Sequence, residues 1–225
     1  MNRQWMRMLL LALYGVLALE PGSACAADTN SLKSVLRSVE RDAKGRVRKG
    51  YLARPTLVDG LPCKMWIRFR EDQTVSMCRL SSDTVIQGQR LPAESTIWFH
   101  DNGRPFRVWL GRPMTVQGLP CKGGPVKKTD TVFYPNGRLE GTFIAAPVTI
   151  QDIPCQKSGL VMLYPDGKLK QCLLARACTI DGKPYQKKLI VHLDEQGRVT
   201  ATEPLPTAWE IVKQIVAFNT RKFKR

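Results

Sequence analysis

The fold of this chain is decided by the stretch Val132-Phe133-Tyr134-Pro135-Asn136-Gly137-Arg138 and by two close copies of it. The copies are Trp98-Phe99-His100-Asp101-Asn102-Gly103-Arg104 and Met162-Leu163-Tyr164-Pro165-Asp166-Gly167-Lys168. Asn-Gly or Asp-Gly between apolar runs is the strongest short-range signal for a β-hairpin, because glycine tolerates the positive φ that a tight turn needs. Each stretch is therefore predicted to join two antiparallel strands.

The hairpin sequence recurs through most of the chain. Weaker copies place Gly45, Thr74 and Gly197 at the turn position, so that successive turns lie 29, 29, 34, 30 and 30 residues apart. The longer interval contains an insertion at 123–128. After each turn comes a second shared phrase, such as Thr115-Val116-Gln117-Gly118-Leu119-Pro120-Cys121, which we interpret as a short strand followed by a loop. This period indicates a tandem repeat.

Alternate residues along the predicted strands share one character. One repeat position holds Phe69, Phe99, Phe133, Leu163 and Leu193, and the position two residues earlier holds Ile67, Ile97, Val161 and Val191. Side chains alternate between the faces of a strand, so both sets are expected on one buried face, and the other face is partly solvated. We predict an all-β protein in which hairpin or meander repeats form an extended antiparallel sheet or a solenoid-like stack, followed by a C-terminal amphipathic helix.

Two segments outside the repeat are predicted to be helical. Within Ser31–Glu40, apolar residues recur at helical spacing. Near the C-terminus, Thr207-Ala208-Trp209-Glu210 is a capping box, and a helix should follow over residues 208–219. The apolar side of that helix is formed by Ile211, Val212, Ile215, Val216 and Phe218. We expect it to cap the end of the sheet, and docking to a membrane surface is the alternative.

The N-terminus and the composition indicate export. Residues 1–27 combine a basic start, an apolar run from Met8 to Leu19 and small residues at Ala24-Cys25-Ala26, as in a secretory signal peptide. A lipoprotein signal with Cys25 lipidated and an uncleaved N-terminal anchor are the alternatives. The mature protein would be periplasmic or secreted. Its six remaining cysteines, in an oxidising compartment, favour disulfides over metal ligation.

Repeat symmetry assigns partners to four of these cysteines. Cys63 and Cys155 both follow the proline that ends a unit, while Cys78 and Cys172 lie in the second strand of the next hairpin. Disulfides Cys63–Cys78 and Cys155–Cys172 are therefore expected together or not at all. Cys121 faces Thr142 in the equivalent place, and Cys178 lies about two units from Cys121 on a different strand, so that a bridge between these two cysteines is not expected.

We divide the chain into a signal peptide (1–27), an N-terminal segment with a short helix (28–44), a β-repeat domain of about five units (45–200), and a linker with the C-terminal helix and its basic tail (201–225). The hairpin motifs, over roughly Val47 to Thr200, resemble MORN repeats and related bacterial β-hairpin repeats. MORN repeats are shorter and carry further glycines that this chain lacks. The resemblance implies a scaffold or binding module rather than a catalyst.

Charge suggests what such a module binds. Lys and Arg number 35 against 19 Asp and Glu, a net charge of +16, which favours an acidic partner. Five cations directly follow the turn and would form a basic column: Arg46, Arg104, Arg138, Lys168 and Arg198. The column could bind lipopolysaccharide or an acidic glycan, or it could only protect the sheet edge and keep the protein in solution. Aromatic residues are not interleaved with it, which disfavours nucleic acid.

Catalytic motifs are sparse. His100 and His192 occupy ordinary outward strand positions, and no phosphate loop, nucleophile elbow or metal-binding motif is present in the sequence. We therefore expect no catalytic residue, cofactor or metal, and a non-enzymatic role in binding or scaffolding in the bacterial cell envelope. Its partner would be an envelope protein or an anionic polymer. The alternatives are a carrier of anionic envelope polymer and an enzyme whose site lies in the non-repeat ends.

Overall fold

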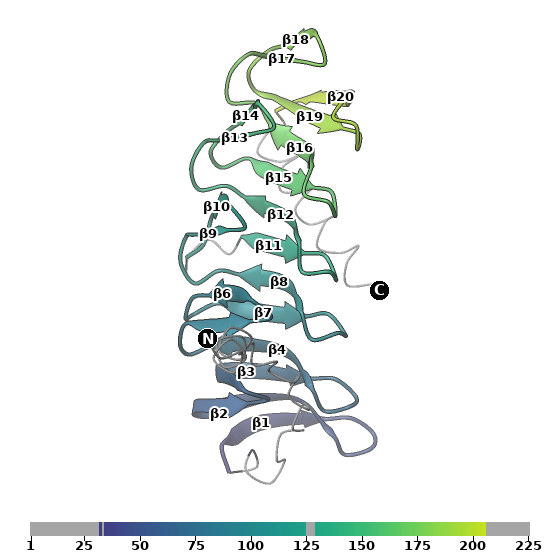
Figure 1. Cartoon of the computed structure of the whole chain (residues 1–225). Helices are drawn as coiled ribbons and strands as arrows, with labels where there is room; N and C mark the ends of the chain where they lie inside the picture. Colours follow the sequence, from purple (N-terminus) through teal and green to yellow (C-terminus); the bar gives the residue numbers. More distant parts are fainter. Residues whose placement is uncertain (1–31, 33, 125–128, 206–225) are drawn as a thin grey trace, which may run out of the picture.

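The computed structural model describes residues 32, 34–124 and 129–205, and all twenty elements in this part are strands (Figure 1). Twelve strands form one antiparallel sheet in the order β1-β2-β3-β4-β7-β8-β11-β12-β15-β16-β19-β20. Their bounds are β1 Leu36–Arg41, β2 Val47–Val58, β3 Leu61–Phe69, β4 Val75–Leu80, β7 Thr96–Phe99, β8 Pro105–Trp109, β11 Asp130–Phe133, β12 Leu139–Phe143, β15 Leu160–Leu163, β16 Leu169–Leu173, β19 Leu189–Leu193 and β20 Val199–Pro204. The all-β fold and the extended sheet of hairpins are confirmed.

The predicted turns have the same backbone bonds in each hairpin. In the turn after β7, the His100 N–H donates to the Arg104 carbonyl (2.8 Å), and the Gly103 N–H donates to the His100 carbonyl (2.9 Å). Gly103 has a φ of 75°, as the turn requires. Between β3 and β4 the same two bonds join Arg70 to Thr74 and Gln73 to Arg70, and Gln73 has a φ of 66°.

This second turn corrects the predicted alignment by one residue. Gln73, and not Thr74, occupies the glycine position, and Thr74 stands where the other turns place a cation. The sequence comparison missed this because Gln73 lacks the glycine signature, although a non-glycine residue can adopt positive φ at some cost in energy.

The second shared phrase folds into a small two-stranded hairpin, in which the residues predicted to be a loop form the second strand. We call these four units the mini-hairpins, and they are β5 Thr84–Ile86 with β6 Gln89–Leu91, β9 Met114–Val116 with β10 Leu119–Cys121, β13 Val148–Ile150 with β14 Ile153–Cys155, and β17 Cys178–Ile180 with β18 Lys183–Tyr185. Both turn residues of a mini-hairpin, for example Gln117 (47°) and Gly118 (83°), have positive φ. This is the type I′ geometry that matches strand twist.

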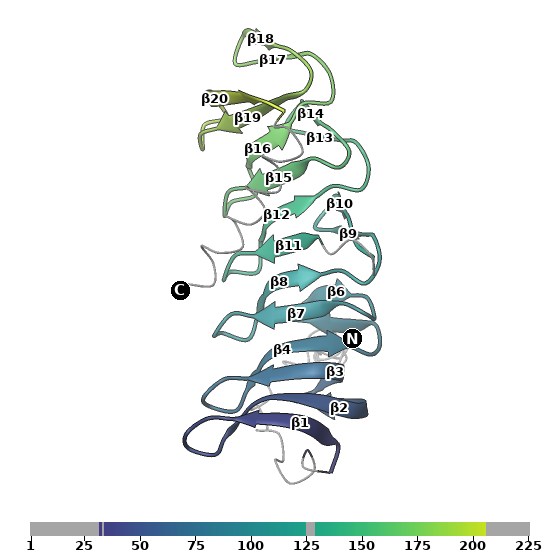
Figure 2. The same ribbon diagram turned by 180° about the vertical axis from the view of Figure 1, so that it is seen from behind.

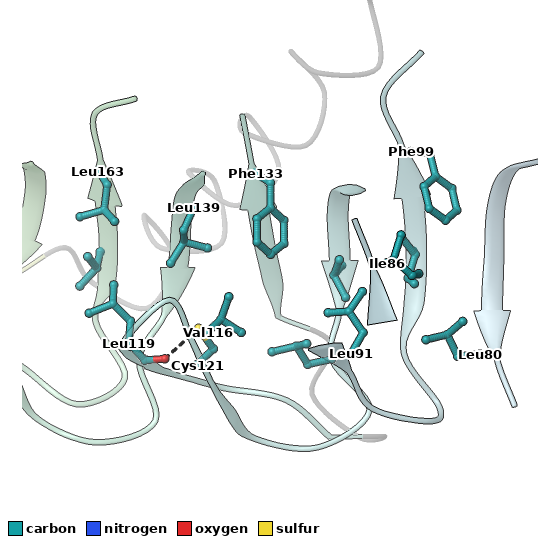
Figure 3. Close-up of a cluster of buried hydrophobic side chains, with 14 of the residues drawn as sticks. Leu80, Ile86, Leu91, Phe99, Val116, Leu119, Cys121, Phe133, Leu139 and Leu163 are labelled. Carbon is teal, nitrogen blue, oxygen red and sulfur yellow. Dashed lines mark hydrogen bonds between the residues drawn. The ribbon is translucent and has the colours of Figure 1, made fainter. Parts of the chain in front are cut away.

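The mini-hairpins form a second layer on the buried face of the sheet. Val116 and Leu119 of one mini-hairpin are buried in the same core as Phe133 and Leu139 of the sheet (Figure 3). The side chain of Gln117, at the tip, accepts a hydrogen bond from the Leu139 N–H (3.0 Å). The predicted inward positions are confirmed, since Ile67, Ile97, Val161 and Val191 are all 0% exposed. The repeat therefore builds an open two-layered column rather than a single bare sheet.

The helix predicted over Ser31–Glu40 is wrong for the part that forms β1, Leu36–Arg41. β1 pairs with β2 in the register Leu36 to Leu52 and Arg41 to Val47, which completes a hairpin of the repeat type. Arg41 takes the position that is apolar in later units. It remains exposed there because β1 is the first strand of the sheet, and its guanidinium donates to the Gly45 carbonyl (2.8 Å).

The predicted signal peptide (1–27) and C-terminal helix (208–219) lie outside the described residues. In the part of the chain that the structure describes, no helix is long and apolar enough to cross a membrane.

Candidate functional site

The turns of the six large hairpins line one long edge of the sheet, which we call the turn edge (Figures 1 and 2). Successive turns are two strands apart, a spacing of about 10 Å. The residue after the positive-φ position is, in order along this edge, Arg46, Thr74, Arg104, Arg138, Lys168 and Arg198. The structure thus brings the five predicted cations into one row, with one neutral position between the first and the third turns.

Most of these cations reach across to the next turn and bind its backbone. The donors and acceptors are Arg46 Nη1 to Glu71 O (2.9 Å), Arg104 Nη1 to Asn136 O (2.8 Å), Arg138 Nη1 to Asp166 O (3.3 Å) and Lys168 Nζ to Glu195 O (2.9 Å). The guanidinium of Arg104 lies directly against the backbone of Gly137. A Cβ atom at residue 137 would be only 2.7 Å from Arg104 Nη1. These bonds link neighbouring units and hold each cationic group in a fixed place.

The cations differ in how far carboxylates neutralise them. Three lie within ion-pair distance of an aspartate of their own turn: Arg46 and Asp42 (2.8 Å), Lys168 and Asp166 (3.2 Å), and Arg198 and Asp194 (2.9 Å). Among the described residues, Arg104 and Arg138 have no carboxylate oxygen within 4.0 Å. A carbonyl orients a guanidinium without cancelling its charge, so positive charge is concentrated at these two adjacent turns.

The position of His100 has a structural use that sequence reasoning missed. His100 Nε2 donates to the Phe133 carbonyl (2.9 Å), Tyr134 Oη donates to the Leu163 carbonyl (2.9 Å), and Tyr164 Oη donates to the Leu193 carbonyl (2.7 Å). Arg70 makes the equivalent bond to the Phe99 carbonyl (2.7 Å). One repeat position therefore carries a second set of bonds between units, made by four residues of three types. The common signal is a long donor directly before the turn.

His192 lies on the outer face near the C-terminal end of the sheet, with Nε2 3.3 Å from Glu203 Oε1. Within the described residues, no three His, Cys, Asp or Glu side chains are grouped as a metal site.

The structure places the predicted cysteine partners side by side as unbridged thiols. Cys63 of β3 pairs in register with Leu80, and Cys78 lies two residues before Leu80 on the same buried face. A hydrogen bond between the two thiols and their burial raise the pKa of Cys63. The bond between Cys155 and Cys172, together with burial, raises the pKa of Cys172 in the same way. The adjacency follows the predicted symmetry, and the disulfides stay a prediction.

The third equivalent pair is Cys121 and Thr142, as the repeat alignment predicts. The backbones of Cys121 and Ile144 form an isolated antiparallel β-bridge, and the Thr142 hydroxyl interacts with the Cys121 thiol. Burial nevertheless raises the pKa of Cys121. The sequence predicts no neighbour for Cys178. It is half-buried at the start of β17, close enough to Cys155 for the two groups to interact, and burial raises its pKa. The packing of β17 beside β14 produces this proximity.

Comparisons with known proteins do not assign the chain to a family. No family model matches it, and no curated protein is significantly similar to it.

Proposed function

We propose that this chain is a non-enzymatic, exported module of the bacterial cell envelope that binds anionic polymer along its turn edge. The resemblance to MORN-type repeats, the signal peptide and the periplasmic or secreted location belong to the same proposal. The observation that carries it is the pair of adjacent cations, Arg104 and Arg138, which are fixed by carbonyls and not paired with carboxylates.

A polymer with regularly spaced charges suits this arrangement. Arg104 and Arg138 stand about 10 Å apart, so one extended polyanion could contact both without bending sharply. Their side chains are already held in place, so less conformational entropy is lost on binding. Lys168 extends the row by one turn, although Asp166 partly neutralises it. The remaining cations at Arg46 and Arg198 stand at the two ends of the row beside aspartates.

The experiment measures binding of the purified protein to heparin and, separately, to lipopolysaccharide across a range of salt concentrations. The variant Arg104→Gln/Arg138→Gln should bind more weakly. The number of counterions released on binding, obtained from the slope of log affinity against log salt, should fall by about two. Arg54→Gln/Arg90→Gln removes the same charge from exposed positions away from the row and is the control. Equal losses in both double variants would reduce the interaction to net charge and contradict the proposed edge site.

A further double variant separates binding from folding. Arg104 and Arg138 also join neighbouring units, so their loss could act through stability. Arg104→Lys/Arg138→Lys keeps both charges and should retain binding if charge at this place is what the polymer contacts. The melting temperature of each variant, measured at the same salt concentrations, shows whether weak binding reflects unfolding. If the protein binds heparin but does not bind lipopolysaccharide, the site would be assigned to sulfated or carboxylated glycans.

A further inference from the structure

The outer face of the sheet, opposite the mini-hairpins, carries apolar residues that are buried although they do not belong to the core. Val132, Leu173 and Ile190 are 1%, 7% and 8% exposed, and none of them is part of the hydrophobic core cluster. Their chain neighbours Phe133, Leu174 and Val191 point to the core. Because side chains alternate along a strand, the first three face the other way.

These residues form a continuous apolar surface over β11 to β19, which we call the outer apolar surface. Leu173 is paired in register with Ile190, and Phe143 with Leu160. Val132 is paired with Gly141, and Gly141 with Met162. The full set is Val132, Gly141, Phe143, Leu160, Met162, Leu173 and Ile190. The mini-hairpins cannot cover this surface, because they pack on the other face.

The chain itself supplies a segment of the right length at the right place. The described residues end at Leu205, directly after β20, which is the neighbour of β19. Twenty further residues follow, at 206–225. A helix over 208–219 would be about 18 Å long, and the four strand spacings from β19 to β11 amount to about 19 Å.

The end of the sheet is a poorer place for this segment. Five of the six residues of β20 are exposed, and Thr200, Ala201 and Thr202 offer little apolar surface. An amphipathic helix is stabilised mainly by burying its apolar side, so the outer apolar surface competes better than the strand end. We propose that residues 207–219 fold back as a helix on the outer apolar surface, with Ile211, Ile215 and Phe218 against the sheet.

Photo-crosslinking tests this placement directly. The purified protein carries p-benzoylphenylalanine at Met162, on the outer apolar surface, or at Thr149, on the exposed side of a mini-hairpin, as the control. After irradiation, the species of monomer mass is digested and its crosslinked peptides are identified. The Met162 probe should join residues 207–219 of the same chain, and the Thr149 probe should not. Crosslinks from Met162 only between two chains, or none to 207–219, would overturn the proposal.

A second measurement keeps the test independent of the probe. Ile215→Asp places a charge on the apolar side of the helix, and Gln214→Asp places the same charge one residue away on its polar side. Ile215→Asp should lower the melting temperature and raise the binding of a hydrophobic dye, while Gln214→Asp leaves both near wild type. If Ile215→Asp leaves the melting temperature unchanged and instead abolishes binding to vesicles containing anionic lipid, the helix docks on membranes and the proposal fails.

Discussion

At the scale of single residues, the repeat lets one part of the chain serve as a control for another. Cys155 and Cys172 face each other in one unit, and Cys121 faces Thr142 in the unit before it. Opposite Cys172 in its hairpin stands Val161, whereas opposite Thr142 stands Thr131, whose hydroxyl lies 3.1 Å from that of Thr142. The two sites therefore differ at two facing positions, Val161 against Thr131 and Cys172 against Thr142, and Cys178 lies near Cys155 in the first site.

The double variant Thr131→Val/Thr142→Cys should therefore form a third disulfide, to Cys121, in oxidised protein. Such a bridge should contribute on the order of 3 kcal/mol, as should each of the two predicted bridges Cys63–Cys78 and Cys155–Cys172. Non-reducing peptide mapping and the free energy of unfolding, with and without reductant, measure both. Thr131→Val alone is the control for repacking. Native cross-links such as Cys63–Cys121 would contradict the register.

A turn aspartate gives a prediction about pH. Asp166 Oδ1 accepts from the Lys168 N–H (3.0 Å), and this bond with the nearby ammonium holds the pKa of Asp166 below its ordinary value of 3.8. A carboxyl with a lowered pKa in the folded state stabilises the protein above pH 3.8, and the contribution is lost as the pH falls through the folded pKa. Asn136 makes the same bond in its turn (2.9 Å) without a charge.

Asp166→Asn should accordingly fold normally at neutral pH and lose less stability than wild type on acidification below pH 4. Urea unfolding at a series of pH values measures the effect. Asp181→Asn, in a mini-hairpin turn, controls for removing one negative charge from the whole protein. If both variants flatten the pH profile equally, general charge and not the turn bond explains the result.

At the scale of elements, the tips of the mini-hairpins fix the two layers to each other. Gln117 Oε1 accepts from the buried Leu139 N–H (3.0 Å), and Gln151 Oε1 accepts from the Leu169 N–H (2.9 Å). Gln87 holds the same place in the preceding unit, but the residue opposite it is Pro105, which has no N–H.

Gln117→Met should thus destabilise the protein by about 1–3 kcal/mol, because it leaves a buried amide without an acceptor. Gln87→Met, with the same change of side chain at a similar positive φ, should be close to neutral. Chemical denaturation of the two variants beside wild type compares them. A similar loss for both would mean that the glutamine serves the turn itself.

The elements also show what a sequence can predict. Turn chemistry is local, so the Asn-Gly and Asp-Gly hairpins, their period and their inward residues followed from the sequence. The helix predicted over Ser31–Glu40 is wrong for residues 36–40 because the apolar residues of this segment mimic helical spacing, while pairing of β1 with β2 decides the outcome. The sequence predicts a loop at Leu119–Cys121 because of Pro120, and the structure has a strand there, since an edge strand tolerates proline.

The candidate site was predictable in part. The positions of the basic residues could be read from the repeat, since each follows a turn. Their bonds to the next turn depend on the distance between units, which no single unit encodes. Lys168 is partly neutralised and Arg104 is not, and this difference depends on Asp166. The turn needs Asp166 for its own geometry, because its carboxylate accepts a bond from the Lys168 N–H.

At the scale of the whole molecule, the repeat predicts that one unit can be removed cleanly. Deleting residues 134–163, which are 30 residues, joins Phe133 to Tyr164 and restores the sequence of a single hairpin. The shorter protein should unfold cooperatively with lower stability, since nearest-neighbour contacts carry a repeat fold. Circular dichroism and thermal unfolding measure this, and deletion of 134–148 alone, half a unit, should abolish folding.

The cysteines report whether the shortened protein keeps its register. The deletion removes Thr142 and Cys155 and brings Cys172 to the place opposite Cys121. Oxidised protein should therefore contain a Cys121–Cys172 cross-link. A folded variant in which these two thiols stay free under oxidation would show that the units do not stack equivalently.

The bonds between turns have a consequence for how the chain is made. Four of the five cations of the turn edge, all except Arg198, bind a carbonyl of the next turn further along the chain. The donors at the position of His100 do the same. Nothing in these bonds waits for a distant part of the sequence, so a unit can settle as soon as the next one is synthesised. A chain that emerges N-terminus first from a ribosome or a translocation pore can therefore fold its units one after another. A chain stalled partway would already contain folded N-terminal units.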